Sequence, residues 1–171
     1  MSDLALIGIH ANSWLAKALA CLDDGQDIVL VTVTATKGSS PRDHGSQMLV
    51  TKTGIWQTIG GGALEFDVMA RARKMLASDD DDWQRQHMTV ILGPDMGQCC
   101  GGQMSLLLEK FTAKQAGALA ALAQEDHYDH MLAHPLESGV PLTLQSAQSP
   151  FDEAVFMAPA MPQQTPLFIY G

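Results

Sequence analysis

A turn of ten residues, GPDMGQCCGG at positions 93–102, separates two short apolar segments, 88–92 and 104–108. A cysteine that only fills a core packs as a small hydrophobic side chain and does not need glycines beside it. Glycines allow positive φ and let another group approach the main chain closely. We therefore interpret the turn as a working centre that joins two strands and presents a thiol.

The composition limits the class of protein. Hydrophobic residues make up 46% of the 171 residues and charged residues 17%, as in a soluble globular domain. The net charge of -9 argues against general affinity for nucleic acid or for an anionic membrane surface. No apolar run has the length of a membrane span, and the first residues lack the basic start of a signal peptide. Three cysteines cannot build a secreted disulfide framework. These features predict a cytoplasmic protein.

Hydrophobic periodicity predicts an α+β fold, a mixed sheet of about five strands with packed helices. The order of the strands does not follow from the sequence. The expected helices are 13–24, 63–77 and 113–125, and the expected strands are 28–34, 47–51, 55–59, 88–92 and 103–110.

The later part of the chain gives weaker signals. Residues 132–145 favour a hairpin, and 157–166 is expected to be a connector. His127, His130 and His134 would share a face of a continuing helix; we expect a solvated face there rather than a zinc site, because no further ligand completes the set. The acidic run 79–82 lacks the ligand spacing of a calcium loop and is expected to be a solvated turn.

Two further glycine-bearing loops follow strands. The loop 38–46 contains Ser39, Ser40 and Arg42, groups suited to holding an oxyanion. Gly60, Gly61 and Gly62 precede a helix, where free N–H groups and the helix dipole favour an anion.

The two loops and the turn 97–102, with Gly101 and Gly102, would form a cleft if they converge. The other interpretation is three ordinary turns. Glu65 then has two interpretations, as a complement to the helix dipole or as a side chain facing the cleft. Gln98 would offer an amide to a heterocycle edge in this cleft.

The adjacent thiols differ in their expected roles. In an extended segment Cys99 and Cys100 would point to opposite sides, so one is expected to be presented while the other packs. A thiolate is a nucleophile and a soft metal ligand, but the spacing does not suit zinc. Cys21 lies in the first predicted helix, and we expect it to fill the core.

The last residues, 166–171, form an apolar run that ends at a glycine, like the first strand of a dinucleotide-binding unit. We therefore expect three parts: a domain at 1–112; a region of helix, hairpin and connector at 113–165; and the start of a Rossmann-like domain at 166–171.

These motifs resemble the XdhC/CoxI family, accessory proteins of molybdenum hydroxylases such as xanthine dehydrogenase. The resemblance runs over about 10–110 and is carried by four stretches, GSSPR (38–42), 45–50, IGGGALE (59–65) and 92–102, with its QCCGG at 98–102. In this family the terminal strand would open the C-terminal Rossmann-like domain.

The resemblance implies a chaperone that binds the molybdenum cofactor (molybdopterin), protects it during sulfuration by a cysteine desulfurase, and inserts it into an apo-hydroxylase. By that analogy Cys99 or Cys100 would contact the molybdenum. The alternative is a thiol-dependent or NAD- or nucleotide-dependent enzyme that uses the Rossmann-like domain, with His44 or His87 as the base. An interaction module that docks the hydroxylase or the desulfurase is compatible with the carrier, and a homodimer is left open.

Overall fold

The computed structural model describes residues 13–93, 101–125, 130–146, 148 and 152–159, and within them the chain forms two sheets and three helices. The larger sheet has the strand order β3-β2-β1-β5-β4, with every neighbouring pair antiparallel. The strands are β1 (Ile28–Lys37), β2 (Gln47–Thr51), β3 (Ile55–Trp56), β4 (Arg85–Ile91) and β5 (Gln103–Phe111). The α+β class and the five strands are confirmed. The expected mixture of strand directions is replaced by antiparallel pairing, and a single bridge between Ser39 and Gly101 is parallel.

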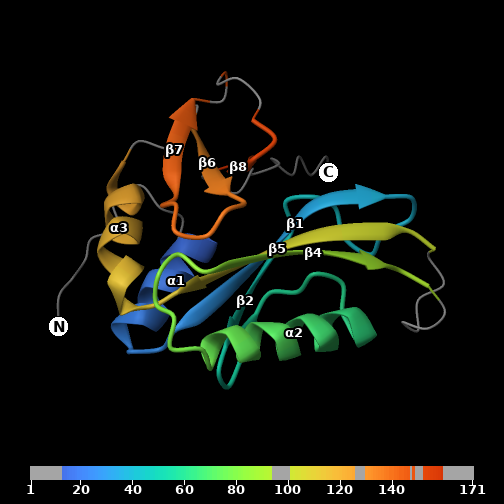
Figure 1. Ribbon diagram of the computed structural model, residues 1–171, viewed down its shortest axis with the longest axis horizontal. Helices are drawn as coiled ribbons and strands as arrows, with labels where there is room; N and C mark the ends of the chain where they lie inside the picture. The colour runs from blue at the N-terminus through green and yellow to red at the C-terminus, as the bar shows by residue number, and fades with distance from the viewer. Residues whose placement is uncertain (1–12, 94–100, 126–129, 147, 149–151, 160–171) are drawn as a thin grey trace, which may run out of the picture.

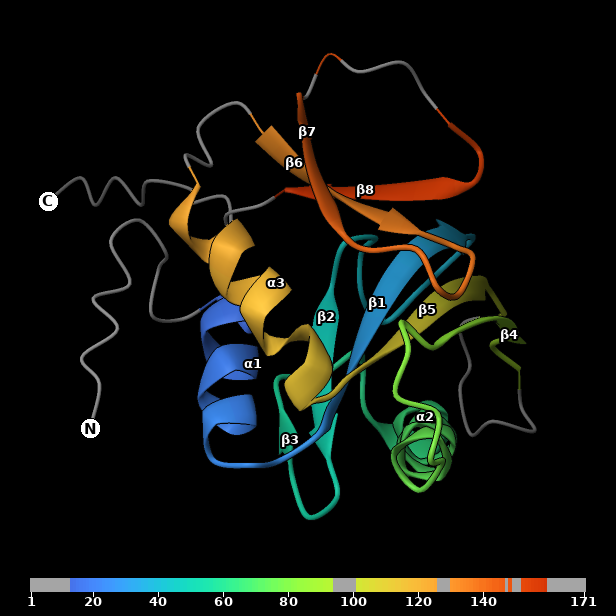
Figure 2. The same ribbon diagram turned by 60° about the vertical axis from the view of Figure 1, so that its left-hand side comes forward.

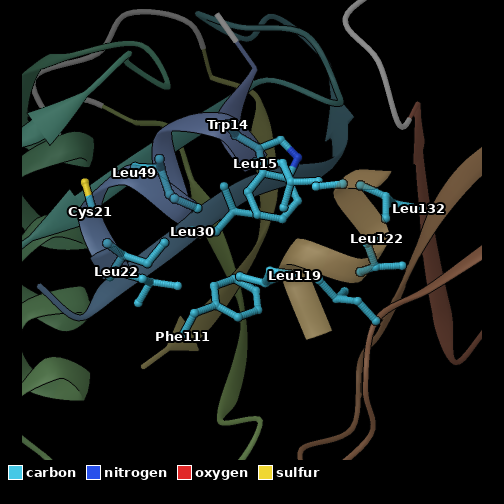
Figure 3. Packing of buried hydrophobic residues seen from close by; sticks show 14 of the residues in the cluster. Trp14, Leu15, Cys21, Leu22, Leu30, Leu49, Phe111, Leu119, Leu122 and Leu132 are labelled. Carbon is cyan, nitrogen blue, oxygen red and sulfur yellow. The ribbon is translucent and has the colours of Figure 1, made fainter. Parts of the chain in front are cut away.

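Strand β1 is buried on both faces, and its alternating side chains divide the core in two. Val29, Val31 and Val33 face helix α2 (Gly62–Leu76), while Ile28 and Leu30 face the opposite side. On that side helices α1 (Trp14–Asp23) and α3 (Ala113–Gln124) pack together (Figures 1 and 2). Figure 3 shows Leu30, Phe111 and Cys21 within this layer. The expectation that Cys21 fills the core is confirmed.

Local signals explain where the helices begin. The Ser13 hydroxyl accepts a hydrogen bond from the Ala16 N–H at 3.2 Å, which caps α1. Thr112 and Gln115 form a capping box at the start of α3. No helix in the described part of the chain is both long and apolar enough to cross a membrane.

The smaller sheet has the order β7-β6-β8, built from β6 (His130–Pro135), β7 (Thr143–Ser146) and β8 (Val155–Pro159). The predicted hairpin is confirmed as β6 and β7. The expected connector at 157–166 is wrong over 157–159, which belong to β8.

The solvated histidine face is also wrong where the structure describes it. His130 and His134 lie on a strand, and the His134 side chain is completely buried; His127 falls outside the described residues. A separation of four residues places two side chains on one face of a strand as well as of a helix. The spacing alone could therefore not distinguish a strand from a helix.

A buried ionic network joins the two sheets. Glu109 of β5 accepts a hydrogen bond from Arg85 Nε at 2.9 Å and lies 2.6 Å from His134 Nδ1. Arg85 Nη1 also donates to the carbonyl oxygens of Glu137, at 2.8 Å, and Val140, at 2.6 Å. Burial alone would raise the pKa of Glu109. His134 and Arg85 together lower it by more than burial raises it, so the pKa lies below its ordinary value of 4.5. Glu109 is therefore an ionised anchor for the smaller sheet.

The turn 78–82 keeps Asp79, Asp80 and Asp82 exposed, as expected, but its main-chain carbonyl groups accept hydrogen bonds from a buried lysine. Lys110 Nζ donates to the carbonyl oxygens of Ser78, at 2.6 Å, and Asp80, at 2.9 Å. Among the described residues no cluster of His, Cys, Asp or Glu could hold a metal ion.

Replacing Glu109 tests the network. Glu109→Gln keeps the shape of the side chain and removes the negative charge that compensates Arg85. We therefore expect it to lower the free energy of unfolding by about 3 kcal/mol at neutral pH. Because the folded-state pKa of Glu109 is depressed, its contribution is complete above pH 4.5 and is lost as the pH falls through the folded-state pKa. Urea unfolding of both proteins at several pH values measures this, and the difference should shrink in acid. Glu137→Gln, at an exposed side chain whose carbonyl alone contacts Arg85, is the control. A difference independent of pH would contradict the assignment.

Candidate functional site

Three segments predicted to form a cleft meet at one end of the larger sheet. The loop 38–46 follows β1, Gly101 and Gly102 precede β5, and the triple glycine leads into α2; Figure 1 shows these connections at the same end. Antiparallel pairing of β1 with β5, which reaches Lys37 opposite Gln103, brings the first two segments together.

The main chain at Gly102 passes directly against the loop 38–46. Its carbonyl oxygen accepts a hydrogen bond from the Leu92 N–H at 2.7 Å, and a Cβ at position 102 would lie 2.0 Å from the Ser39 carbonyl oxygen. Real Cβ contacts do not approach this distance, and here the obstructing atom belongs to the backbone. Position 102 therefore accepts only glycine without a shift of the main chain.

The same loop contacts the triple glycine on its other side. Gly60 has φ 134°, and a Cβ there would lie 2.7 Å from Pro41 Cγ and 3.9 Å from Arg42 Cγ. The loop 38–46 is thus enclosed between residues 101–102 and Gly60. These close approaches explain why glycines recur at the ends of the segments.

Glu65 fixes the segment before α2. One of its carboxylate oxygens, Oε2, accepts hydrogen bonds from the Thr58 hydroxyl, from the Ile59 N–H at 3.2 Å and from the Gly61 N–H at 3.1 Å. The Gly60 N–H donates to Thr58 Oγ1 at 3.2 Å. Two of the three N–H groups of the triple glycine are therefore bonded within the chain. The Gly62 N–H, at the first position of α2, has no acceptor among the described residues.

Sequence reasoning placed Glu65 correctly in the first turn of the helix but missed Thr58. Residues 55–59 were expected to form a strand, whereas β3 ends at Trp56 because Gln57 takes a positive φ of 62°. The chain turns there, and Thr58 can then reach the carboxylate. The sequence signal that could have indicated Thr58 is the position of its hydroxyl between a short β segment and three glycines.

Besides the Gly62 N–H, the described groups that are free to meet a ligand lie on the loop 38–46. Ser39 and the Arg42 side chain are exposed, and Ser40, which is half-buried, donates its hydroxyl proton to the Arg42 carbonyl oxygen at 2.8 Å. Gln98, Cys99 and Cys100, which the sequence placed in the same cleft, lie outside the described residues. The free groups among the described residues are therefore a guanidinium, a hydroxyl and a main-chain N–H, which are the kinds of donor that bind oxyanions.

Gly102→Ala tests the close crossing. We expect it to lower the free energy of unfolding by at least about 2 kcal/mol, because the added methyl group overlaps the Ser39 carbonyl oxygen. Gly117→Ala is the control: position 117 lies in α3 with nothing within 4 Å of an added Cβ, and this change should stabilise by about 0.5–1 kcal/mol. Urea unfolding measures both. Equal stability of the Gly102 variant and the unchanged protein would contradict the crossing.

Comparison with known proteins found a family and a solved structure that resemble parts of this chain. The chain matches the XdhC and CoxI family over residues 21–86, which include the loop 38–46 and the triple glycine. A crystal structure described as a xanthine dehydrogenase from Bacillus halodurans superposes with a TM-score of 0.61 at 23% sequence identity. The superposition covers 79% of this chain and 42% of that one, so this chain spans less than half of that structure, and the likeness establishes the fold. No curated protein gave a significant match. The match to the XdhC and CoxI family thus extends from α1 through β1, β2 and α2 into β4.

Proposed function

We propose that this chain is an accessory protein of a xanthine dehydrogenase-type molybdenum hydroxylase, and that it binds the molybdenum cofactor at the end of the larger sheet. In this role it protects the cofactor, supports its sulfuration by a cysteine desulfurase and inserts it into the apo-hydroxylase. The observation that carries the proposal is the enclosure of the loop 38–46 between Gly102 and Gly60, within a chain whose family match covers that loop.

The described residues fit the anionic part of such a cofactor. A phosphate monoester needs donors and positive charge, which Arg42, Ser39 and the Gly62 N–H supply at the surface. Glu65 is held by three donors from 58–61, and it thereby supports the segment that borders the loop. We assign it to positioning the segment. Gln98 is proposed for the pterin edge, and Cys99 or Cys100 for the metal.

The proposed role is that of a carrier, and the cofactor's own redox chemistry belongs to the hydroxylase that receives it. The residues of this chain bind, orient and shield. The enzyme alternative needs a base beside a thiol. The two candidate bases are both exposed, His44 in the loop 38–46 and His87 on β4. Neither therefore gives a specific reason to prefer the enzyme over the carrier. NAD or another nucleotide at a Rossmann-like domain stays a prediction.

Cofactor retention tests the proposal. The chain is incubated with free molybdopterin cofactor, and the amount retained after gel filtration is measured. Arg42→Gln should weaken binding about ten-fold or more, since a hydrogen bond to a charged group contributes about 1.5–3 kcal/mol. Arg73→Gln, which removes another exposed arginine near the other end of α2, is the matched control and should bind like the unchanged chain. Equal retention by the two variants would remove the loop 38–46 from the site.

The thiols are tested in the same assay. Cys99→Ala and Cys100→Ala should differ, with loss of retention in the variant that lacks the presented sulfur and an unchanged circular dichroism spectrum in both. Equal retention by both variants and the unchanged chain would exclude a thiol contact. Turnover with NAD instead of cofactor retention would favour the enzyme.

A further inference from the structure

Phe66 is an aromatic side chain that the described fold leaves uncovered. It lies near the beginning of α2, and 72% of its surface is exposed. The helix packs on the sheet through Leu64, Val68, Ala72 and Met75, and position 66 lies on the side of the helix opposite these residues. Among the described residues its ring has no aromatic partner. A single exposed apolar side chain is common on protein surfaces, so the informative feature is the place of this ring.

The ring lies beside the candidate site. Long side chains on a helix lean toward its N-terminus, so a residue covers the surface of the turn before it. The turn before Phe66 contains Gly62 and Ala63, which are both exposed and too small to cover a ring. Phe66 is about 6 Å along the helix axis from Gly62, and the lean of the side chain shortens this distance for the ring. The ring therefore lies close to the Gly62 N–H, the free main-chain donor of the site.

Arg42 reaches the same end of the helix. A Cβ on Gly60 would lie 3.9 Å from Arg42 Cγ, so the stem of the arginine passes the residue that lies two positions before α2. The guanidinium, the Gly62 N–H and the ring of Phe66 are thus gathered at one end of the helix, and both side chains are exposed there. An anion held by the first two groups would bring the rest of its molecule to the ring.

The surroundings of the ring favour a small flat ligand over a protein surface. Arg71, Arg73 and Lys74 are exposed on the later turns of α2, so the uncovered apolar surface around Phe66 is small. A protein interface buries about 800 Å² on each partner and has few charged residues at its centre. An aromatic ring with small neighbours instead offers an open face, on which heterocycles stack.

We propose that Phe66 positions the ligand by stacking on its heterocycle, while Arg42 and the Gly62 N–H hold its phosphate. This assignment depends on the proposed function and adds a residue to the same site. In the molybdenum cofactor the heterocycle is the pterin. Gln98 is proposed for the edge of the pterin and Phe66 for its face, so the two contacts are compatible. Phe66 thereby determines specificity, because a phosphate ester without a ring gains nothing from it.

Retention of free molybdopterin cofactor by the full chain tests the proposal. Phe66→Leu keeps an apolar side chain and removes the ring, so we expect binding to weaken about five-fold or more, as is typical of a lost aromatic pair. Phe66→Tyr keeps the ring and should bind like the unchanged chain. Because position 66 is exposed, neither change should alter unfolding in urea.

A tryptophan reporter tests the contact directly. In Phe66→Trp the cofactor should protect the new tryptophan from quenching by acrylamide, because a stacked indole is covered. Ala118→Trp is the matched control, since it places a tryptophan at an exposed position of α3, outside the site, where the cofactor should give no protection.

Equal retention by Phe66→Leu and the unchanged chain, with Arg42→Gln weakened, would overturn the stacking and leave the proposed function standing. The absence of protection in Phe66→Trp would also overturn it. If Phe66→Leu retained the cofactor but transferred less of it to the apo-hydroxylase, Phe66 would be a docking residue for that enzyme and not a stacking residue. An unchanged chain that retained no cofactor would contradict the proposed function and the stacking together.

Discussion

The antiparallel pairing of β1 with β5 is the constraint on which the rest of the structure depends. It runs from Ile28 opposite Phe111 to Lys37 opposite Gln103 and fixes two ends of the molecule at once. At one end Phe111 joins the layer formed with α1 and α3. At the other end the loop that leaves β1 must meet the residues that enter β5, which are Gly101 and Gly102. The candidate site therefore follows from strand register, and the glycines allow the two main chains to come as close as that register demands.

Elements with a clear local signal could be predicted from the sequence. The apolar run at 28–34 marks a buried central strand, and the first predicted helix, α1, has apolar residues on one face and a serine cap. The direction of strand pairing, however, depends on contacts between distant segments. We expected a mixed sheet, whereas the larger sheet is antiparallel. His134 shows the same limit. Its burial depends on Glu109, which is 25 residues away, and no local pattern around His134 contains that information.

The site could be predicted only in part, for a related reason. Glycines before strands and helices marked the segments that converge, because close backbone approach leaves a trace in residue type. The role of Glu65 depends on the positive φ of Gln57, which brings Thr58 and the N–H groups of Ile59 and Gly61 to one carboxylate oxygen. A left-handed conformation at a glutamine is unusual, and nothing in its neighbours predicts it. The sequence therefore identified the loops but not the interactions that hold them.

These interactions divide the described polar groups of the site into two classes. Glu65, Thr58 and the N–H groups of Gly60 and Gly61 are bonded to one another and form a frame, whereas Ser39 and Arg42 on the enclosed loop stay exposed. Exposed charge contacts are weak individually and are screened by salt. The proposed carrier role would benefit from this division, because a carrier must release its ligand to a second protein. The frame would keep the geometry fixed between loading and delivery, and a few modest contacts at the surface would let the receiving enzyme compete for the same phosphate.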